Sequence, residues 1–190
     1  MVTRFRTSMI AYALVITLAL CTGSCSLLKY PRNGIYLLPT GFTGYILIFY
    51  GVPDGVELQT EGGIWVYNIP PDGVLKVKDK ASPGVVSRSY FYVDDTGARQ
   101  AILTLRITGD RAPSGLPQNK FGNISMDQFE NTVYVTGESG FGTLPSDDGN
   151  VYQCTSFVVS TPKQSDSVYR QREIRESELV QMHMKRLQKR

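Results

Sequence analysis

Residues 45–50, YILIFY, are apolar or aromatic at every position. A strand with one wet face alternates apolar and polar residues, so a run that is apolar on both faces indicates a strand that is covered on both sides. Residues 74–78, VLKVK, alternate instead and predict a strand with one exposed face. The fold is therefore expected to hold a covered central strand with other strands around it.

Outward from this run, β-type segments recur through the body of the chain from Gly34 to Ser160. They are rich in Val, Ile, Tyr, Phe and Thr, and turn residues separate them. The segments are GIYLLP (34–39), GYILIFYG (44–51), GIWVYNIP (63–70), GVLKV (73–77), RSYFYV (88–93), QAILTLRI (100–107), NTVYVTG (131–137) and YQCTSFVVS (152–160). We predict an all-β fold, an antiparallel β-sandwich or barrel-like domain, followed by a C-terminal helical tail.

The first residues have the layout of an export signal. Arg4 and Arg6 precede an uncharged apolar run, residues 9–20, which small and polar residues follow. A transmembrane helix needs roughly 20 apolar residues, so this run is short for a permanent span. The next residues, Thr22-Gly23-Ser24-Cys25, resemble the lipobox of bacterial lipoproteins, although Thr22 stands where that motif usually has Leu. The resemblance implies a signal peptide cut before Cys25 and a diacylglycerol on the Cys25 thiol.

Two alternatives stay open: an ordinary signal peptide that is cut nearby, and a retained N-terminal anchor. If Cys25 is acylated, Cys154 has no partner within the mature chain. Cys154 is then expected to be a buried thiol in a strand. Without the lipid, Cys25 is free to form a disulfide with Cys154.

The lipobox resemblance and the composition together divide the chain into a signal peptide (1–24), a tether (25–33), a β domain (34–161) and a basic helical tail (162–190). Residues 163–190 hold eight Lys or Arg and four Asp or Glu, whereas residues 25–162 hold ten and thirteen. The body is slightly acidic, which argues against nucleic acid as a partner.

The tail predicts a helix from Ser165 or Asp166 to Arg190. Val180, Met184 and Leu187 fall at i, i+4 and i+7 and form a narrow apolar stripe, so the helix is expected to be largely solvated. An alternative is that its last residues, MKRLQKR, dock on an anionic surface.

One turn of the body is a candidate contact site. In LPTGFTGY (38–45), Gly41 and Gly44 permit turn dihedrals and Phe42 can fold back onto the sheet. This pattern favours a turn with an aromatic plug. The alternative is a loop in which Gly41, Phe42 and Gly44 contact a ligand or partner.

The same stretch carries a family resemblance. LPTGFTGY, then Ile69-Pro70 with Gly73-Val74-Leu75, and YFYVD (90–94) with Gly97 look like an uncharacterised family of small exported bacterial proteins. In that family an I/L-P-x-G-Y/F-x-G opening precedes an apolar strand. The resemblance covers roughly residues 35–100 and implies a compartment and an architecture, with no activity.

Few residues favour catalysis. The one histidine, His183, lies in the tail, which argues against Ser-His, Cys-His and His-zinc sites. Asp147 and Asp148 are interpreted as part of a tight turn, because Val158 stands at position 12 of a loop that begins at Asp147, where an EF-hand requires Glu. A hydrolase that uses two acids, such as Glu138 with Asp94, is the alternative activity. We predict no catalytic residue, no metal and no cofactor.

Together these features predict a bacterial cell-envelope lipoprotein, a binding or structural module at the membrane surface. An envelope protein or a glycan is the expected partner, bound by a loop or by an exposed sheet edge. The lipid would place the protein in the outer membrane of a Gram-negative host, because Ser26 is not an acidic retention signal. The alternatives are a secreted protein and an envelope hydrolase that uses Asp and Glu carboxylates on a β scaffold.

Overall fold

The structure is a computed structural model and describes residues 33–81, 87–105, 125–139 and 142–189. All described residues belong to one compact unit, Arg32–Arg190. Its strands are β1 (Gly34–Pro39), β2 (Gly44–Tyr50), β3 (Gln59–Glu61), β4 (Ile64–Asn68), β5 (Val74–Val77), β6 (Arg88–Val93), β7 (Arg99–Thr104), β8 (Tyr134–Thr136), β9 (Gly142–Pro145) and β10 (Val151–Ser160). Its helices are α2 (Met126–Asn131) and α3 (Ser165–Leu187).

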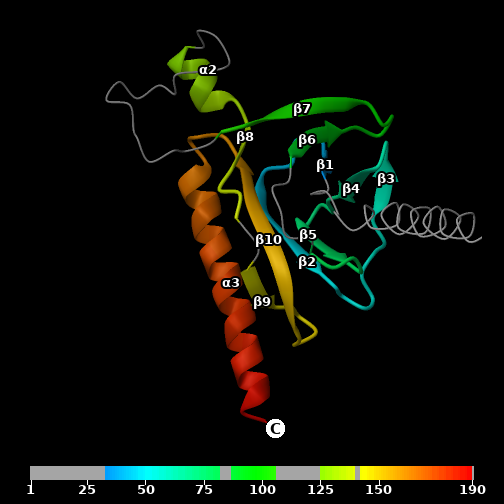
Figure 1. Ribbon diagram of the computed structural model, residues 1–190. Helices are drawn as coiled ribbons and strands as arrows, with labels where there is room; N and C mark the ends of the chain where they lie inside the picture. The colour runs from blue at the N-terminus through cyan, green and yellow to red at the C-terminus, as the bar shows by residue number, and fades with distance from the viewer. Residues whose placement is uncertain (1–32, 82–86, 106–124, 140–141, 190) are drawn as a thin grey trace, which may run out of the picture. The chain divides into compact units, whose positions relative to one another are not determined.

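The strands form one curled sheet, a half-barrel, in the order β3-β4-β1-β6-β7-β8-β10-β2-β5, and β9 pairs with β10 (Figure 1). The predicted all-β fold with a C-terminal helix is thus confirmed in its barrel-like form. Glu61 of β3 and Arg99 of β7 form an ion pair between two strands that are not neighbours in the sheet. Arg99 Nη1 and Nη2 donate to Glu61 Oε1 and Oε2 at 3.1 and 2.8 Å. This bidentate pair links the end of the sheet to a strand four places along it.

The expectation of purely antiparallel pairing is wrong, because the sheet is mixed. β1 runs parallel to both β4 and β6, β2 runs parallel to β5, and β7 runs parallel to β8. The reason lies in β1 and β2, which a short turn joins but which do not pair with each other. β2 pairs with β10 and β5 instead, which leaves both edges of β1 to strands that come later in the chain.

The central strand β2 is buried on both faces, as the YILIFY run predicts. Ile46, Ile48 and Tyr50 face the inside of the curl and belong to an inner cluster whose other members include Tyr36, Leu75 and Phe157. Tyr45, Leu47 and Phe49 face the other way into an outer cluster with Cys154, Val158 and Val168. The strand therefore separates two apolar layers.

Helix α3 covers the outer cluster and contacts β2, β9 and β10 (Figure 1). Val168 is buried, and Tyr169 and Leu179 pack against the cluster. Most of α3 is exposed to solvent, as the sequence predicts, and only one face packs on the sheet. The predicted stripe of Val180, Met184 and Leu187 is not that face, because these side chains stay exposed. The helix begins after Gln164, which makes no side-chain capping bond.

The short helix α2 has a full capping box. Ser125 Oγ accepts from the Gln128 amide and the Gln128 side chain accepts from the Ser125 amide. Among the described residues, no helix is long and apolar enough to cross a membrane. The described strands, α3 and both clusters lie within Arg32–Arg190, so we expect this unit to fold without the preceding residues.

Candidate functional site

The turn between β1 and β2 is held tightly to the sheet. The Phe42 amide donates to the Pro39 carbonyl oxygen at 3.0 Å, and the Tyr92 hydroxyl donates to the Phe42 carbonyl oxygen at 2.7 Å. Gly41 has a φ of 75°, in the left-handed region that favours glycine. The turn is therefore a fixed feature of the end of β1.

The Phe42 ring is half-buried and packs against the inner cluster. It lies over Gly44 and Gly73: a Cβ on Gly73 would stand 3.2 Å from Phe42 Cζ and 2.5 Å from the Tyr45 carbonyl oxygen. Glycine at position 73 therefore lets the turn before β5 approach the turn before β2. The ring fills the place of the aromatic plug that the sequence favours.

A shallow hollow of about 200 Å³ opens beside this ring. Its walls come from three parts of the chain: residues 42–45, the turn at Pro71 and Asp72, and the α3 residues Gln171 and Arg175. Phe42 and Gly44, two of the three predicted contact residues, line it, whereas Gly41 is not among its lining residues. The structure thus joins the predicted loop to the C-terminal helix, a pairing that the sequence did not reveal.

A larger groove of about 490 Å³ adjoins the hollow and shares Gln171 and Arg175 with it. Ile174, Leu179 and Met182 supply its apolar lining, and Glu178 and Asp147 supply acidic groups. Arg175 Nη1 donates weakly to the Asp72 carbonyl oxygen at 3.4 Å. Within the described residues it forms no ion pair with a carboxylate. A cation therefore stands where the hollow and the groove meet.

The wall formed by α3 is fixed by a polar clamp on β2. The Tyr45 hydroxyl donates to Glu176 Oε1 at 2.6 Å, and Arg172 Nε donates to the same oxygen at 2.9 Å. The Arg172 guanidinium also lies 5.5 Å from the centre of the Tyr45 ring, within reach of a cation–π contact. Burial, and then the bond to Glu176, raise the pKa of Tyr45 above its usual value.

A second polar feature lies inside the curl, where tyrosines from four strands or their ends meet. The Tyr36 ring stacks on Tyr67 with centroids 4.5 Å apart and on Tyr90 at 5.0 Å. The Tyr50 side chain hydrogen bonds with those of Tyr36 and Tyr67. Burial raises the pKa of Tyr36, Tyr50 and Tyr90, so these hydroxyls stay protonated well into the alkaline range.

Arg88 and Glu138 border this tyrosine cluster. The Tyr90 hydroxyl donates to Glu138 Oε1, and Arg88 Nη1 lies 3.9 Å from the same oxygen. The side chains of Arg88 and Glu138 are only 15% and 23% exposed, so each charge is largely removed from water. Sequence reasoning missed this group, because its members come from strands and turns far apart in the chain and carry no local spacing signal.

The two acids that the sequence named for a hydrolase belong to different networks. Glu138 contacts Tyr90 and Arg88, whereas Asp94 Oδ1 accepts from Thr96 and Ala98 in the exposed turn after β6. Asp94 directly follows the last residue of β6, four positions along the chain from Tyr90.

Other candidates take structural places. Asp148 lies in the turn between β9 and β10, where its Oδ1 accepts from the Asn150 amide at 2.9 Å, as the tight-turn interpretation predicts. His183 Nδ1 lies 2.9 Å from the Gly149 carbonyl oxygen, so the histidine fastens α3 to that turn. Cys154 is a free buried thiol in β10, as predicted. In the described parts of the chain, no group of three or more His, Cys, Asp or Glu is placed to hold a metal ion.

Several predictions concern residues outside those that the structure describes. They are the signal peptide and Cys25 with most of its tether. The turn Gly137–Gly142 is described only in part. Its Ser139 extends the pairing of β10, since its amide donates to the Ser156 carbonyl oxygen at 2.9 Å.

These observations define a class of protein: a mixed half-barrel, closed on its outer face by a C-terminal helix, with a buried tyrosine cluster inside. The chain belongs to a family of unknown function, DUF6843, whose model matches residues 31–168. This agrees with the resemblance to an uncharacterised family. A crystal structure from Bacillus anthracis named "Putative Lipoprotein" resembles 72% of this chain and 78% of its own, with 18% identity and a TM-score of 0.46. No curated protein matches the chain.

Proposed function

We propose that the protein is a lipid-anchored component of the bacterial cell envelope, whose β domain binds another envelope component. The observation that carries the anchor is the order of the N-terminal sequence: an export signal, small residues, and then Cys25. Diacylglycerol on Cys25 would hold the protein at a membrane surface.

The start of the domain supports this arrangement. The Gly34 amide donates to the Ser87 carbonyl oxygen at 2.9 Å, and the Asn33 carbonyl oxygen accepts from the Trp65 amide at 3.1 Å. The chain is thus fixed in the sheet eight residues after Cys25. Eight extended residues reach at most about 28 Å, so a lipid on Cys25 would keep the domain close to the headgroups.

The binding surface that we propose is the hollow beside Phe42. An aromatic ring, the Gln171 amide and the Arg175 guanidinium converge there from two elements on a clamped wall. A flat ring with a few convergent polar groups suits a glycan or a peptide segment. An envelope glycan or protein is accordingly the partner that we propose.

The anchor is tested by intact mass and N-terminal peptide mapping of protein from the membrane fraction of its own host. We expect a lipid-sized addition on Cys25 that Cys25→Ser lacks, together with loss of the variant from the membrane fraction. An unmodified Cys25 in a soluble fraction would contradict the proposal and would make a secreted protein the better interpretation.

The binding surface needs a separate test. A photo-crosslinking amino acid at Thr43, which lines the hollow, should capture an envelope component in intact cells. The same group at Thr96, in the exposed turn after β6, is the matched control. Equal capture at both positions, or none at Thr43, would argue against the hollow whatever the state of Cys25.

A further inference from the structure

The last turns of α3 differ from the rest of the helix in charge. From Val180 to Lys189 the chain holds Lys185, Arg186 and Lys189 and no acidic residue. Among the described residues, no carboxylate forms an ion pair with any of these three cations. Earlier in the helix, by contrast, Arg172 pairs with Glu176. Positive charge therefore collects at the end of α3, beside the turn that carries Asp147 and Asp148.

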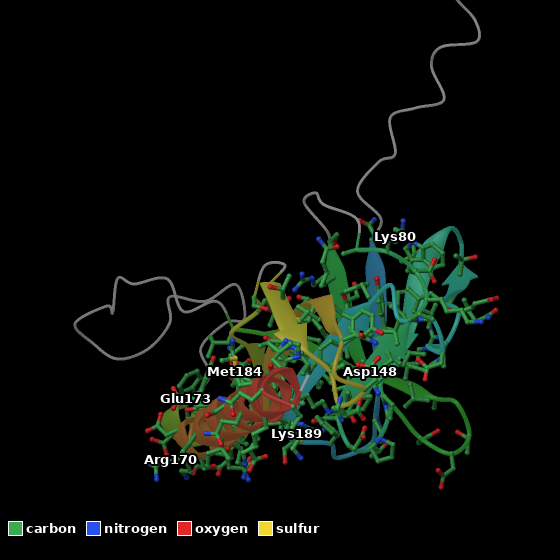
Figure 2. All side chains as sticks on the ribbon, turned by 90° about the horizontal axis from the view of Figure 1, so that it is seen from below. Lys80, Asp148, Arg170, Glu173, Met184 and Lys189 are labelled. Carbon is green, nitrogen blue, oxygen red and sulfur yellow. The ribbon has the colours of Figure 1, made fainter. Side chains whose placement is uncertain are left out.

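Apolar side chains are exposed at the same place. Val180, Met184 and Leu187 are 43%, 52% and 51% exposed. Met184 and Lys189 project from different sides of α3 (Figure 2). Val180, Met184 and Leu187 follow one side of the helix, and Lys185 and Lys189 follow the opposite side. A single surface therefore meets both groups only at the end of the helix.

The end of the helix is also held in position. Arg186 Nη2 donates to the Asp147 carbonyl oxygen at 2.7 Å, and His183 contacts the Gly149 carbonyl oxygen. Both carbonyls belong to the turn between β9 and β10, so the helix end moves with the sheet. A contact made by this end would therefore orient the whole β domain.

From this combination we propose that the C-terminal end of α3 is a second membrane contact, which docks on an anionic lipid surface. Basic residues attract anionic headgroups, and exposed apolar side chains enter the boundary between headgroups and acyl chains. The inference rests on the proposed function. A weak contact between α3 and the membrane is occupied far more of the time when a lipid on Cys25 already holds the domain nearby. Two attachments would limit how the β domain can turn relative to the membrane.

The test uses residues 32–190, which form one compact unit, so that its outcome does not depend on Cys25. We expect this fragment to cosediment with phosphatidylglycerol vesicles at low salt, to bind phosphatidylcholine vesicles far more weakly, and to dissociate at 0.5 M salt. The double variant Lys185→Gln/Lys189→Gln should lower the partition coefficient about 25-fold, since each basic residue near such a surface contributes about fivefold.

Matched controls sit elsewhere on exposed parts of the protein. Lys80→Gln/Arg170→Gln removes the same charge from two exposed positions away from the end of α3 and should alter binding less than twofold. Met184→Ser/Leu187→Ser should weaken binding by about fivefold for each side chain, whereas Ile174→Ser should have little effect. All of these side chains are exposed, so thermal unfolding should be unchanged.

Three results would overturn the proposal: no binding to anionic vesicles, equal losses for the two charge variants, or binding that high salt leaves intact. A fragment that dimerises through Met184 and Leu187 while ignoring vesicles would assign this end to a second copy of the chain. A lipidated Cys25 with no vesicle binding by the fragment would keep the anchor and remove only the second contact.

Discussion

Gly73 and Gly41 provide a test of how closely the two turns at the hollow approach each other. Both glycines have a φ of 75°, so an alanine at either position meets the same unfavourable backbone conformation. They differ in their surroundings. A Cβ at Gly41 would have no atom within 4 Å, whereas one at Gly73 would lie 2.5 Å from the carbonyl oxygen of Tyr45.

The magnitude follows from these two contributions. A left-handed L-residue costs roughly 1–2 kcal/mol, and the lower entropy of unfolded alanine offsets up to about 1 kcal/mol of that. Gly41→Ala should therefore lower the free energy of unfolding by about 1 kcal/mol. Gly73→Ala adds a clash with the buried strand β2, which costs about 2 kcal/mol more because that backbone has no room to move.

Urea unfolding and thermal melts of residues 32–190 would measure both variants. For a domain of this size, about 3 °C in Tm corresponds to 1 kcal/mol, so we expect losses of about 3 °C for Gly41→Ala and about 9 °C for Gly73→Ala. Because the clash displaces the turn that carries Asp72, crosslinking from Thr43 should also fall in Gly73→Ala. Equal stability losses in the two variants would refute the close approach of the turns.

Three further outcomes are expected. Tyr45→Phe removes a 2.6 Å hydrogen bond to Glu176 and should cost about 1.5 kcal/mol in urea unfolding; a double-mutant cycle with Glu176→Gln should show positive coupling, and additivity would contradict the clamp. Burial raises the pKa of the Cys154 thiol to about 11, so it should react with a thiol reagent at pH 8 only as fast as the domain opens; rapid reaction of the native domain would contradict its burial. The pKa values of Cys154 and Tyr36 are raised in the folded domain, so both groups ionise at lower pH in the unfolded chain. The free energy of unfolding should therefore be unaffected by these groups below about pH 9 and should fall as pH rises further. Urea titrations at pH 8 and 10.5 should show a smaller fall for Tyr36→Phe than for the unmodified domain.

Hydrophobic pattern was enough to locate most strands. Each of the eight predicted segments contains a strand, and the covered run 45–50 is the central strand β2. The pattern missed β3 and β9, which have three and four residues and expose much of their surface. Such short strands bury too few side chains to give a hydrophobic period in the sequence. They form because they pair with β4 and β10.

The sequence pattern did not reveal whether neighbouring strands run parallel or antiparallel. An alternating or covered run has the same appearance whether its neighbour is parallel or antiparallel, and only a short turn follows Pro39. The two strands it joins instead become parts of different regions of the sheet, β1 beside β4 and β6, and β2 beside β10. The parallel pairs arise from this choice of partners, which depends on tertiary packing.

The two polar features were predictable to different degrees. Phe42 and Gly44 stand in a local motif, so the sequence could mark their turn, although not the α3 residues that complete the hollow. Arg88 and Glu138 meet across 50 positions of sequence, and neither has neighbours that signal burial. Only the curl of the sheet brings them to the same tyrosine.

The position of α3 changes how the proposals can be tested. Removing residues 163–190 would uncover Cys154 and Val158 and would delete Val168, a buried member of the outer cluster. Lost binding after such a truncation would report an opened core, because exposing a packed apolar layer costs several kcal/mol, comparable with the total stability of many domains. The tail is therefore part of the domain's structure as well as a candidate surface. Its contacts with a membrane or a partner have to be separated from folding by single exposed side chains, such as Lys185 and Arg175, that the core does not need.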